Sequence, residues 1–196
     1  MARARHGGLR VIAGSAGGLS LVAPKGSAAR PTADRVKESL FAALGPARIV
    51  DASVLDLYAG SGALAIESLS RGAARAVLVE RDHAGVNAVR RNLAITRLRD
   101  RARVQDSTVA TFLAGKPPAE RPFDLVFLDP PYAAGTPELG RVLVGLDRTG
   151  WLADGAAVVV ERSSADPPVP APDSWETTWE RAYGDTLVTV LTTPTG

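Results

Sequence analysis

The stretch Val54-Leu55-Asp56-Leu57-Tyr58-Ala59-Gly60-Ser61-Gly62 decides the fold class of this chain. Its apolar run, Val54 to Tyr58, is typical of a buried strand, and a Gly-Ser-Gly turn ends it. An apolar-periodic helix follows directly. Gly60 and Gly62 let the backbone approach a ligand closely, and a helix start offers unpaired N–H groups. The stretch therefore predicts a nucleotide-type site at the end of a strand.

Two later features sharpen this prediction. Glu80 ends the next apolar strand and lies 20 positions after Gly60, where an acidic side chain would meet ribose hydroxyls. The tetrapeptide Asp129-Pro130-Pro131-Tyr132 ends a third apolar strand and is a much rarer pattern.

The composition indicates one ordinary globular α/β domain. The chain has 196 residues, of which 45% are hydrophobic and 22% charged. It has no cysteine and only two histidines, which excludes disulfides and thiolate chemistry and argues against a zinc site, so we expect no metal. The apolar runs are too short for a membrane helix, and no secretory signal is visible. A cytoplasmic location is the expectation.

The net charge of +2 is unevenly distributed. Residues 1–50 hold eight Lys/Arg against two acids, and residues 71–103 hold nine against three. Residues 151–196 reverse the balance, with two against seven. The basic segments could form a surface that faces a polyanion, or they could be a solvated arginine-rich face; charge alone leaves both open.

The first 50 residues are predicted to form an extension ahead of the core. Leu9–Ala13 and Leu19–Ala23 are β-prone runs that indicate a hairpin with a flexible tip. A helix should follow, with Asp34 as its N-cap and Gly45-Pro46 as its end. This predicts a hairpin-plus-helix extension over residues 1–50 ahead of an α/β core over residues 51–196.

From residue 53 onward, β and α elements alternate. This pattern implies a mostly parallel sheet with helices on both faces, closed by an antiparallel hairpin between Trp175 and Thr192. We expect strands over 53–58, 76–80, 102–105, 123–128 and 156–160, and helices over 62–71, 83–97 (N-cap Asp82), 107–114 and 136–146.

An acidic residue marks the end of each of four predicted strands: Asp56, Glu80, Asp106 and Asp129. In an open α/β sheet, ligands bind outside the carboxyl ends of the strands. A helix N-cap is an alternative explanation for Asp106. Four such residues on successive strands favour a binding site.

The Asp-Pro-Pro-Tyr tetrapeptide also has a direct chemical interpretation. A following proline keeps Asp129 extended, so that its carboxylate and a nearby backbone carbonyl can accept both hydrogens of an NH₂ group. Tyr132 supplies an aromatic face for a flat base. An exocyclic amine is a poor nucleophile, and accepting its hydrogens directs its lone pair toward an electrophile. A rigid loop with a surface tyrosine is the simpler alternative.

Three motifs together resemble one family. Asp129-Pro130-Pro131-Tyr132 is similar to the (Asn/Asp)-Pro-Pro-(Tyr/Phe) signature of methyltransferases that act on exocyclic base amines, and residues 56–62 are similar to their S-adenosylmethionine loop. The segment Arg30-Pro31-Thr32-Ala33-Asp34-Arg35-Val36-Lys37-Glu38-Ser39-Leu40-Phe41 resembles the one that marks RsmD-type 16S ribosomal RNA guanine-N2 methyltransferases. Gly150-Trp151-Leu152 fits the same family.

The resemblance implies a Rossmann-like class I methyltransferase fold with seven strands, S-adenosyl-L-methionine as cofactor, and 16S rRNA or the small ribosomal subunit as partner, with no membrane and a monomeric state. It implies that Asp129, Pro130 and Tyr132 hold the guanine. The implied cofactor residues are Asp56, Tyr58, Gly60, Gly62, Glu80, Arg81, Asp106 and Ser107. The implied RNA contacts are Arg10, Arg30, Thr32, Arg35 and Pro131. The resemblance also implies that the extension over residues 1–50 faces the RNA and that residues 51–196 form the S-adenosylmethionine-dependent methyltransferase core. The family's basic element in the first hairpin is replaced here by Ser15-Ala16-Gly17-Gly18-Leu19-Ser20.

Three other functions remain open from the sequence. An amino-methyltransferase that acts on DNA or on another RNA is the nearest, although for DNA the chain has little room for a separate target-recognition domain. A nicotinamide-dependent oxidoreductase would explain Gly60 and Glu80 but leaves Asp-Pro-Pro-Tyr unexplained. A catalytically silent RNA-binding protein would not need intact cofactor and acceptor motifs.

Overall fold

The computed structural model describes residues 9–24, 32–117, 122–130, 136–148 and 150–196, with the side chains of residues 32 and 33 left aside. In chain order the helices are α1 (Thr32–Leu44), the 3-10 turn η1 (Pro46–Arg48), α2 (Ala63–Ser70), α3 (His83–Thr96), the 3-10 turn η2 (Arg99–Arg101), α4 (Val109–Leu113) and α5 (Thr136–Leu146). The strands are β1 (Ser53–Leu57), β2 (Arg75–Glu80), β3 (Ala102–Asp106), β4 (Phe123–Leu128), β5 (Leu152–Ser163), β6 (Glu176–Tyr183) and β7 (Thr186–Thr192).

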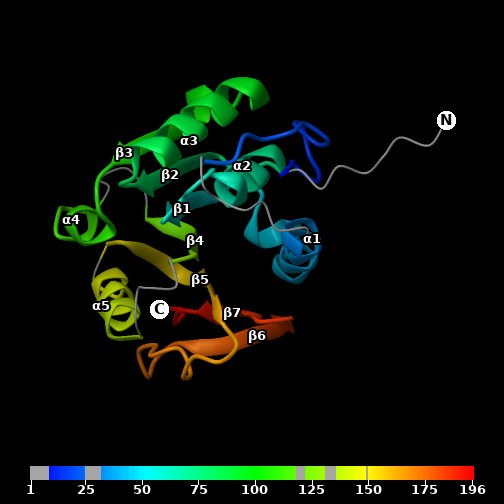
Figure 1. Ribbon diagram of the computed structural model, residues 1–196. Helices are drawn as coiled ribbons and strands as arrows, with labels where there is room; N and C mark the ends of the chain where they lie inside the picture. The colour runs from blue at the N-terminus through cyan, green and yellow to red at the C-terminus, as the bar shows by residue number, and fades with distance from the viewer. Residues whose placement is uncertain (1–8, 25–31, 118–121, 131–135, 149) are drawn as a thin grey trace.

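The strands form one seven-stranded sheet in the order β3-β2-β1-β4-β5-β7-β6 (Figure 1). The first five strands pair in parallel, and β7 pairs antiparallel with both β5 and β6. The strand order reverses between β1 and β4, which is the switch point where ligands bind in such sheets. The mostly parallel sheet, its helices and its closing hairpin are confirmed.

Helices cover both faces of the sheet, because each buried strand needs an apolar cover. In Figure 1, α1 lies on one side of the stacked strands, while α4 and α5 lie on the other. Two hydrophobic clusters correspond to these faces: one joins the sheet to α1, α2 and α3, and the other joins it to α4 and α5.

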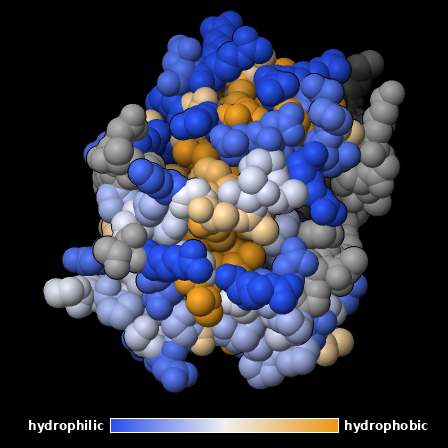
Figure 2. Space-filling model, turned by 90° about the vertical axis from the view of Figure 1, so that its left-hand side faces the viewer, coloured by the Kyte–Doolittle hydropathy of each residue, from blue (hydrophilic) through white to orange (hydrophobic). Residues whose placement is uncertain are grey.

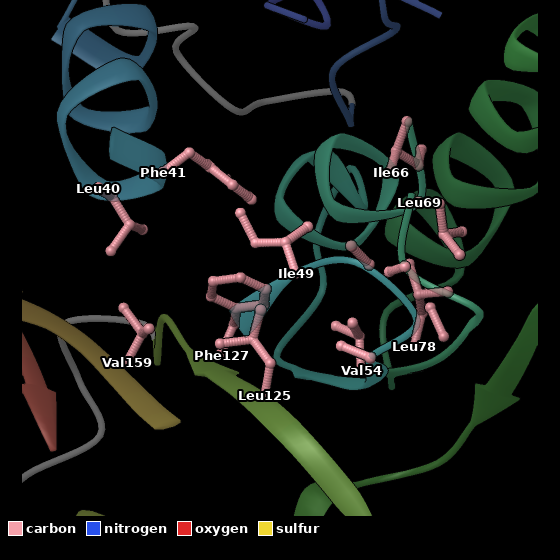
Figure 3. Packing of buried hydrophobic residues seen from close by; sticks show 14 of the residues in the cluster. Leu40, Phe41, Ile49, Val54, Ile66, Leu69, Leu78, Leu125, Phe127 and Val159 are labelled. Carbon is pink, nitrogen blue, oxygen red and sulfur yellow. The ribbon is translucent and has the colours of Figure 1, made fainter. Parts of the chain in front are cut away.

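The first cluster attaches α1 directly to the centre of the sheet. Leu40 and Phe41 of α1 point toward Phe127 of β4 and Val159 of β5 (Figure 3). The rings of Phe41 and Phe127 have their centroids 6.0 Å apart. The helix that carries part of the family-like segment is therefore packed into the same core as the central strands.

The face over α4 and α5 carries an apolar band bordered by hydrophilic residues (Figure 2). The upper part of this face, on the side of α3 and β3, is mostly hydrophilic (Figure 2). No helix within the described residues is both long enough and apolar enough to cross a membrane.

Several sequence-based expectations were wrong in detail. Asp34 is not the N-cap of α1, because the helix begins at Thr32 and Asp34 lies in its first turn, where it pairs with Arg10. The cap of α4 is Thr108, whose side chain accepts from the Thr111 N–H, so Asp106 does not cap it. Strand β5 extends over Leu152–Ser163, well beyond the expected 156–160, because β7 pairs with its second half.

The first hairpin also differs from the expectation in two ways: its arms share fewer β-type pairs, and its tip is held by hydrogen bonds to α2. Within its described arms, a single β-bridge joins Arg10 to Ser20. Its tip is docked on α2, however: Ser15 N–H donates to the Ser70 carbonyl, and Ala16 N–H donates to Ser70 Oγ. A Cβ at Gly14 would lie 1.9 Å from the Ser70 carbonyl oxygen, so this close approach requires glycine. The tip is therefore fixed by tertiary contacts.

Candidate active site

The glycine loop after β1 has the backbone conformation that its sequence predicts. Gly60 and Gly62 both have positive φ, at 56° and 75°. A Cβ at Gly62 would lie 2.9 Å from Leu78 Cδ2, so a side chain there would clash with the core as well as strain the backbone. Tyr58 is a non-glycine residue at φ 65°, which turns the chain sharply out of β1.

Asp56 lies fully buried at the end of β1. Its carboxylate accepts the Ala65 N–H at 3.2 Å, in the first turn of α2, where the cap residue Gly62 has no side chain to do so. Burial, helped by the nearby charges of Asp129 and Glu80 and opposed by the Ala65 hydrogen bond, raises the pKa of Asp56 to about 7. The two carboxylates act on Asp56 because β1 lies between β2, which ends at Glu80, and β4, which Asp129 follows directly.

Glu80, at the end of β2, is bound to the glycine loop. One carboxylate oxygen accepts the Gly60 N–H at 2.8 Å, and the other accepts the N–H groups of Arg81 and Asp82, both at 2.8 Å. These bonds use about three of the four acceptor positions of a carboxylate, so one remains for a hydroxyl group. The 20-residue spacing from Gly60 to Glu80 thus corresponds to a direct contact.

Gly85 makes this contact possible and was missed by sequence reasoning. A Cβ at Gly85 would lie 2.8 Å from Glu80 Cγ and 3.2 Å from the Gly60 carbonyl oxygen. Its signal in the sequence was a glycine inside the first turn of a helix, a position where glycine costs about 1 kcal/mol relative to alanine. Asp82 caps the same helix through the Gly85 N–H at 3.1 Å, as predicted.

The next strand end supplies Asp106 and Ser107. Asp106 is exposed and stands opposite Glu80 in the β2–β3 register. The Ser107 N–H donates to the Glu80 carbonyl at 3.1 Å. The Ser107 hydroxyl is buried and has no hydrogen-bond partner among the described residues. A buried, unpaired hydroxyl beside Glu80 fits a polar ligand that supplies the missing bond.

Asp129 and Pro130 follow directly after β4. Leu128, the last residue of β4, is in register with Leu57, the last residue of β1, so Asp129 lies at the switch point. Asp129 is exposed and Pro130 is half-buried. Pro131 and Tyr132 lie outside the described residues. The structure thus brings the start of the Asp-Pro-Pro-Tyr motif to the same edge of the sheet as Asp56 and Glu80.

Tyr58 and Arg81 border this site. The Tyr58 hydroxyl donates to Glu138 of α5 at 3.3 Å. Partial burial, together with the charge and hydrogen bond of Glu138, raises the pKa of Tyr58 to about 12, although the Arg81 charge acts in the opposite direction. The Arg81 side chain is exposed. Tyr58 thus lies at the start of the glycine loop, and Arg81 lies next to Glu80, which binds that loop. Glu138 is a further neighbour of Tyr58, and nothing in the sequence indicated this contact.

The predicted RNA contacts are only partly described. Arg10 and Arg35 are exposed, and Arg10 pairs with Asp34 at 2.9 Å. Arg30 lies outside the described residues, and Thr32 opens α1 but its side chain is not described. No group of three or more His, Cys, Asp or Glu side chains within the described ranges is arranged to hold a metal ion.

Comparison with known proteins identifies the family. Residues 9–192 match the family model described as "Conserved hypothetical protein 95". The chain is 41% identical over 187 residues to the ribosomal RNA small subunit methyltransferase D of Escherichia coli K12, covering 94% of this chain and 91% of that protein. The chain belongs to this family. The ribosomal RNA small subunit methyltransferase D of Haemophilus influenzae is 37% identical, covering 91% of this chain and 90% of that protein.

Solved structures agree with this family and with the class I methyltransferase fold. An Escherichia coli structure, yhhF, described as a candidate methyltransferase, superposes with a TM-score of 0.82 at 37% identity, covering 96% of this chain and 99% of that one. The structure of SMU.776, described as a methyltransferase complexed with SAH, shares the fold at a TM-score of 0.63 and only 11% identity, over 81% of this chain and 48% of that one.

Proposed function

We propose that this protein transfers a methyl group from S-adenosylmethionine to the exocyclic N2 of a guanine in the 16S rRNA of the small ribosomal subunit. The observation that carries the proposal is the position of Asp129-Pro130 after β4, beside the glycine loop and Glu80. The relatives named as small subunit rRNA methyltransferases, at up to 41% identity over most of both chains, support the RNA substrate.

The charges of the site favour S-adenosylmethionine over a nicotinamide dinucleotide. Asp56, Glu80 and Asp129 are close enough for the last two to raise the pKa of the first. Three carboxyl groups around one loop repel a diphosphate but attract a cationic ligand. An oxidoreductase, which the spacing of Gly60 and Glu80 alone permits, is therefore the weaker alternative.

The residues of the site offer groups that suit S-adenosylmethionine, including a backbone that can approach it closely and polar atoms for its hydroxyl groups. The left-handed Gly60 and Gly62 bring the loop backbone close to a ligand, the remaining acceptor position of Glu80 suits a ribose hydroxyl, and Ser107 Oγ offers an unpaired hydroxyl beside it. When bound, S-adenosylmethionine supplies an activated methyl group on a sulfonium. The task left to this chain is therefore to hold and orient the target amine.

In the proposed mechanism, Asp129 and the Pro130 carbonyl accept the two hydrogens of the guanine amine, and Tyr132 stacks on the base. The attacking nitrogen gains positive charge, which a neighbouring carboxylate stabilises more in the transition state than in the ground state. The proton on the methylated nitrogen then leaves to Asp129 or to solvent.

Substitution of Asp129 tests the proposal. Asp129→Ala should lower the single-turnover rate of methyl transfer to small-subunit particles by about 10²–10³, while leaving cofactor affinity nearly unchanged. Asp129→Asn should be milder, since its amide oxygen still accepts a hydrogen bond. Tyr132→Phe should retain much activity, whereas Tyr132→Ala should not, because stacking needs the ring. Near-wild-type transfer by Asp129→Ala would contradict the proposed role.

Mass analysis of the methylated nucleoside tests the position on the base. The proposal expects N2-methylguanosine in 16S rRNA. Methylation of an adenine amine, or of DNA in preference to rRNA, would favour the alternative amino-methyltransferases.

A further inference from the structure

Asn92 of α3 connects two segments that have different functions in the proposed reaction. Its side chain is fully buried. Oδ1 accepts the Val22 N–H at 2.7 Å, and Nδ2 donates to the Val22 carbonyl at 2.9 Å. Nδ2 also donates to the Ser61 carbonyl at 2.9 Å. One amide group therefore bonds both the N-terminal segment, residues 9–24, and the glycine loop, residues 58–62.

We propose that Asn92 is a positioning residue that couples RNA binding by the N-terminal segment to cofactor binding by the glycine loop. This inference rests on the proposed function. Ser61 lies between the two left-handed glycines, so its carbonyl is part of the loop that faces the cofactor. Val22 lies three positions before residue 25. The stretch from 25 to 31, which includes Arg30, connects it in the chain to α1.

The chemistry of these bonds explains why asparagine is suited to this position. Both amide hydrogens and the amide oxygen are used, so Asn92 satisfies two carbonyls and one N–H group in a buried location. An apolar residue of similar size would leave those three backbone groups unpaired. An aspartate would place an oxygen atom against the Val22 and Ser61 carbonyls, which would repel it.

The coupling should be positive. A bound cofactor orders the glycine loop and, through Ser61 and Asn92, the backbone at Val22. RNA that then binds the N-terminal segment has less disorder to remove, and each ligand should strengthen the other by the same factor.

Other anchors of the N-terminal segment provide matched controls. Ser70 Oγ accepts the Ala16 N–H and donates to the Ala13 carbonyl, so Ser70→Ala loosens the segment on α2. Neither bond touches the glycine loop. Thr96, one turn after Asn92, is buried and its hydroxyl donates to carbonyls of its own helix, so Thr96→Val removes a buried polar contact of α3 alone.

The experiment measures the affinity for S-adenosylhomocysteine by calorimetry, with and without a saturating 16S rRNA transcript. The wild type should bind S-adenosylhomocysteine about 5-fold more tightly, or better, with RNA present, and RNA affinity should improve by the same factor with S-adenosylhomocysteine. In Asn92→Ala this factor should fall to about one. Ser70→Ala and Thr96→Val should keep it, even where they lower the melting temperature.

Asn92→Asp, which is nearly isosteric, provides the same test if the alanine variant does not fold, and its factor should also fall to about one. A wild-type factor of one, or an Asn92 variant that keeps the wild-type factor, would overturn the inference while methyl transfer to RNA stays intact. Failure of the wild type to bind S-adenosylhomocysteine or to methylate rRNA would instead overturn the proposed function, and this inference with it.

Discussion

Glu80 is fixed by backbone N–H groups from two segments, so its substitution tests both ligand binding and loop order. Glu80→Ala should weaken S-adenosylmethionine binding by about 1.5–3 kcal/mol, roughly 10- to 150-fold, because a charge-assisted hydrogen bond is removed. Glu80→Gln should lose less, since its amide oxygen can still accept. Calorimetry measures both variants, and unchanged affinity in Glu80→Ala would remove Glu80 from the cofactor site.

Because its pKa is raised on folding, Asp56 should make the free energy of unfolding decrease as the pH rises. Its pKa is raised from 3.8 to about 7 in the folded protein. Between these values the folded state holds a proton that the unfolded chain releases, so stability falls as pH rises, by at most about 1.4 kcal/mol per pH unit. Asp56→Asn keeps a neutral acceptor for the Ala65 N–H but does not titrate.

The difference in unfolding free energy between wild type and Asp56→Asn isolates this effect. Urea titrations from about pH 5 to about pH 8 should show the wild type losing stability relative to the variant as pH rises toward 7. A difference that does not change over this range would mean that the Asp56 carboxyl titrates near its ordinary value.

At the level of elements, Glu67 of α2 attaches the N-terminal hairpin to the core. Its fully buried carboxylate accepts the N–H groups of Ile12 at 2.7 Å and Ala13 at 3.1 Å, and pairs with Arg71 at 2.6 Å. Glu67→Ala should destabilise the protein by about 3–5 kcal/mol, because it leaves the Ile12 and Ala13 N–H groups and the partly buried Arg71 without their partner. Hydrogen exchange should show reduced protection at Ile12 and Ala13 first.

The arginine-rich segment 71–103 is explained only when its elements are seen in the fold. Three of its arginines stabilise the core: Arg71 pairs with Glu67, Arg75 bonds Ser53, and Arg101 donates to the Leu69 and Ala73 carbonyls at the end of α2. Five others are exposed on α3, the turn after it and β3: Arg90, Arg91, Arg97, Arg99 and Arg103. The sequence counts alone did not separate these two groups.

Across the whole molecule, the exposed arginines of α3, the turn after it and β3 lie toward one edge of the sheet. The edge strand β3 carries exposed Arg103 and Asp106, and the opposite edge strand β6 carries exposed Glu176, Glu180 and Arg181. Six strand spacings of about 4.8 Å separate these edges by roughly 29 Å. The N-terminal segment is bound to α2 and α3, on the side of these arginines. We therefore expect RNA to approach from the N-terminal and β3 side.

Deletion of residues 1–8, which contain Arg3 and Arg5, should lower RNA affinity and reduce the slope of log affinity against log salt, by about 0.7–0.9 for each phosphate that is no longer neutralised. Cofactor affinity should not change. The double variant Asp173→Asn/Glu176→Gln changes charge near the β6 edge and should leave the slope unaltered. An unchanged slope in the deletion variant would assign RNA binding to another surface.

The sequence by itself determined the local elements and their order. Alternating apolar strands and periodic helices, with Gly60 and Gly62 at one turn, were enough to predict a mostly parallel sheet and the strand-end position of Asp56, Glu80, Asp106 and Asp129, because these signals act over a few residues. The cap at Asp82 was local too and was confirmed.

Only the tertiary structure decided the contacts between distant segments. Asn92 is one of several polar residues in α3, and nothing near it in the sequence indicated a bond to Val22, 70 residues earlier in the chain. The space that Gly85 leaves for Glu80, the docking of the hairpin tip on Ser70 and the burial that shifts the pKa of Asp56 have the same origin. Each depends on which groups meet when the sheet and helices pack, and packing is not encoded in any short stretch of the chain.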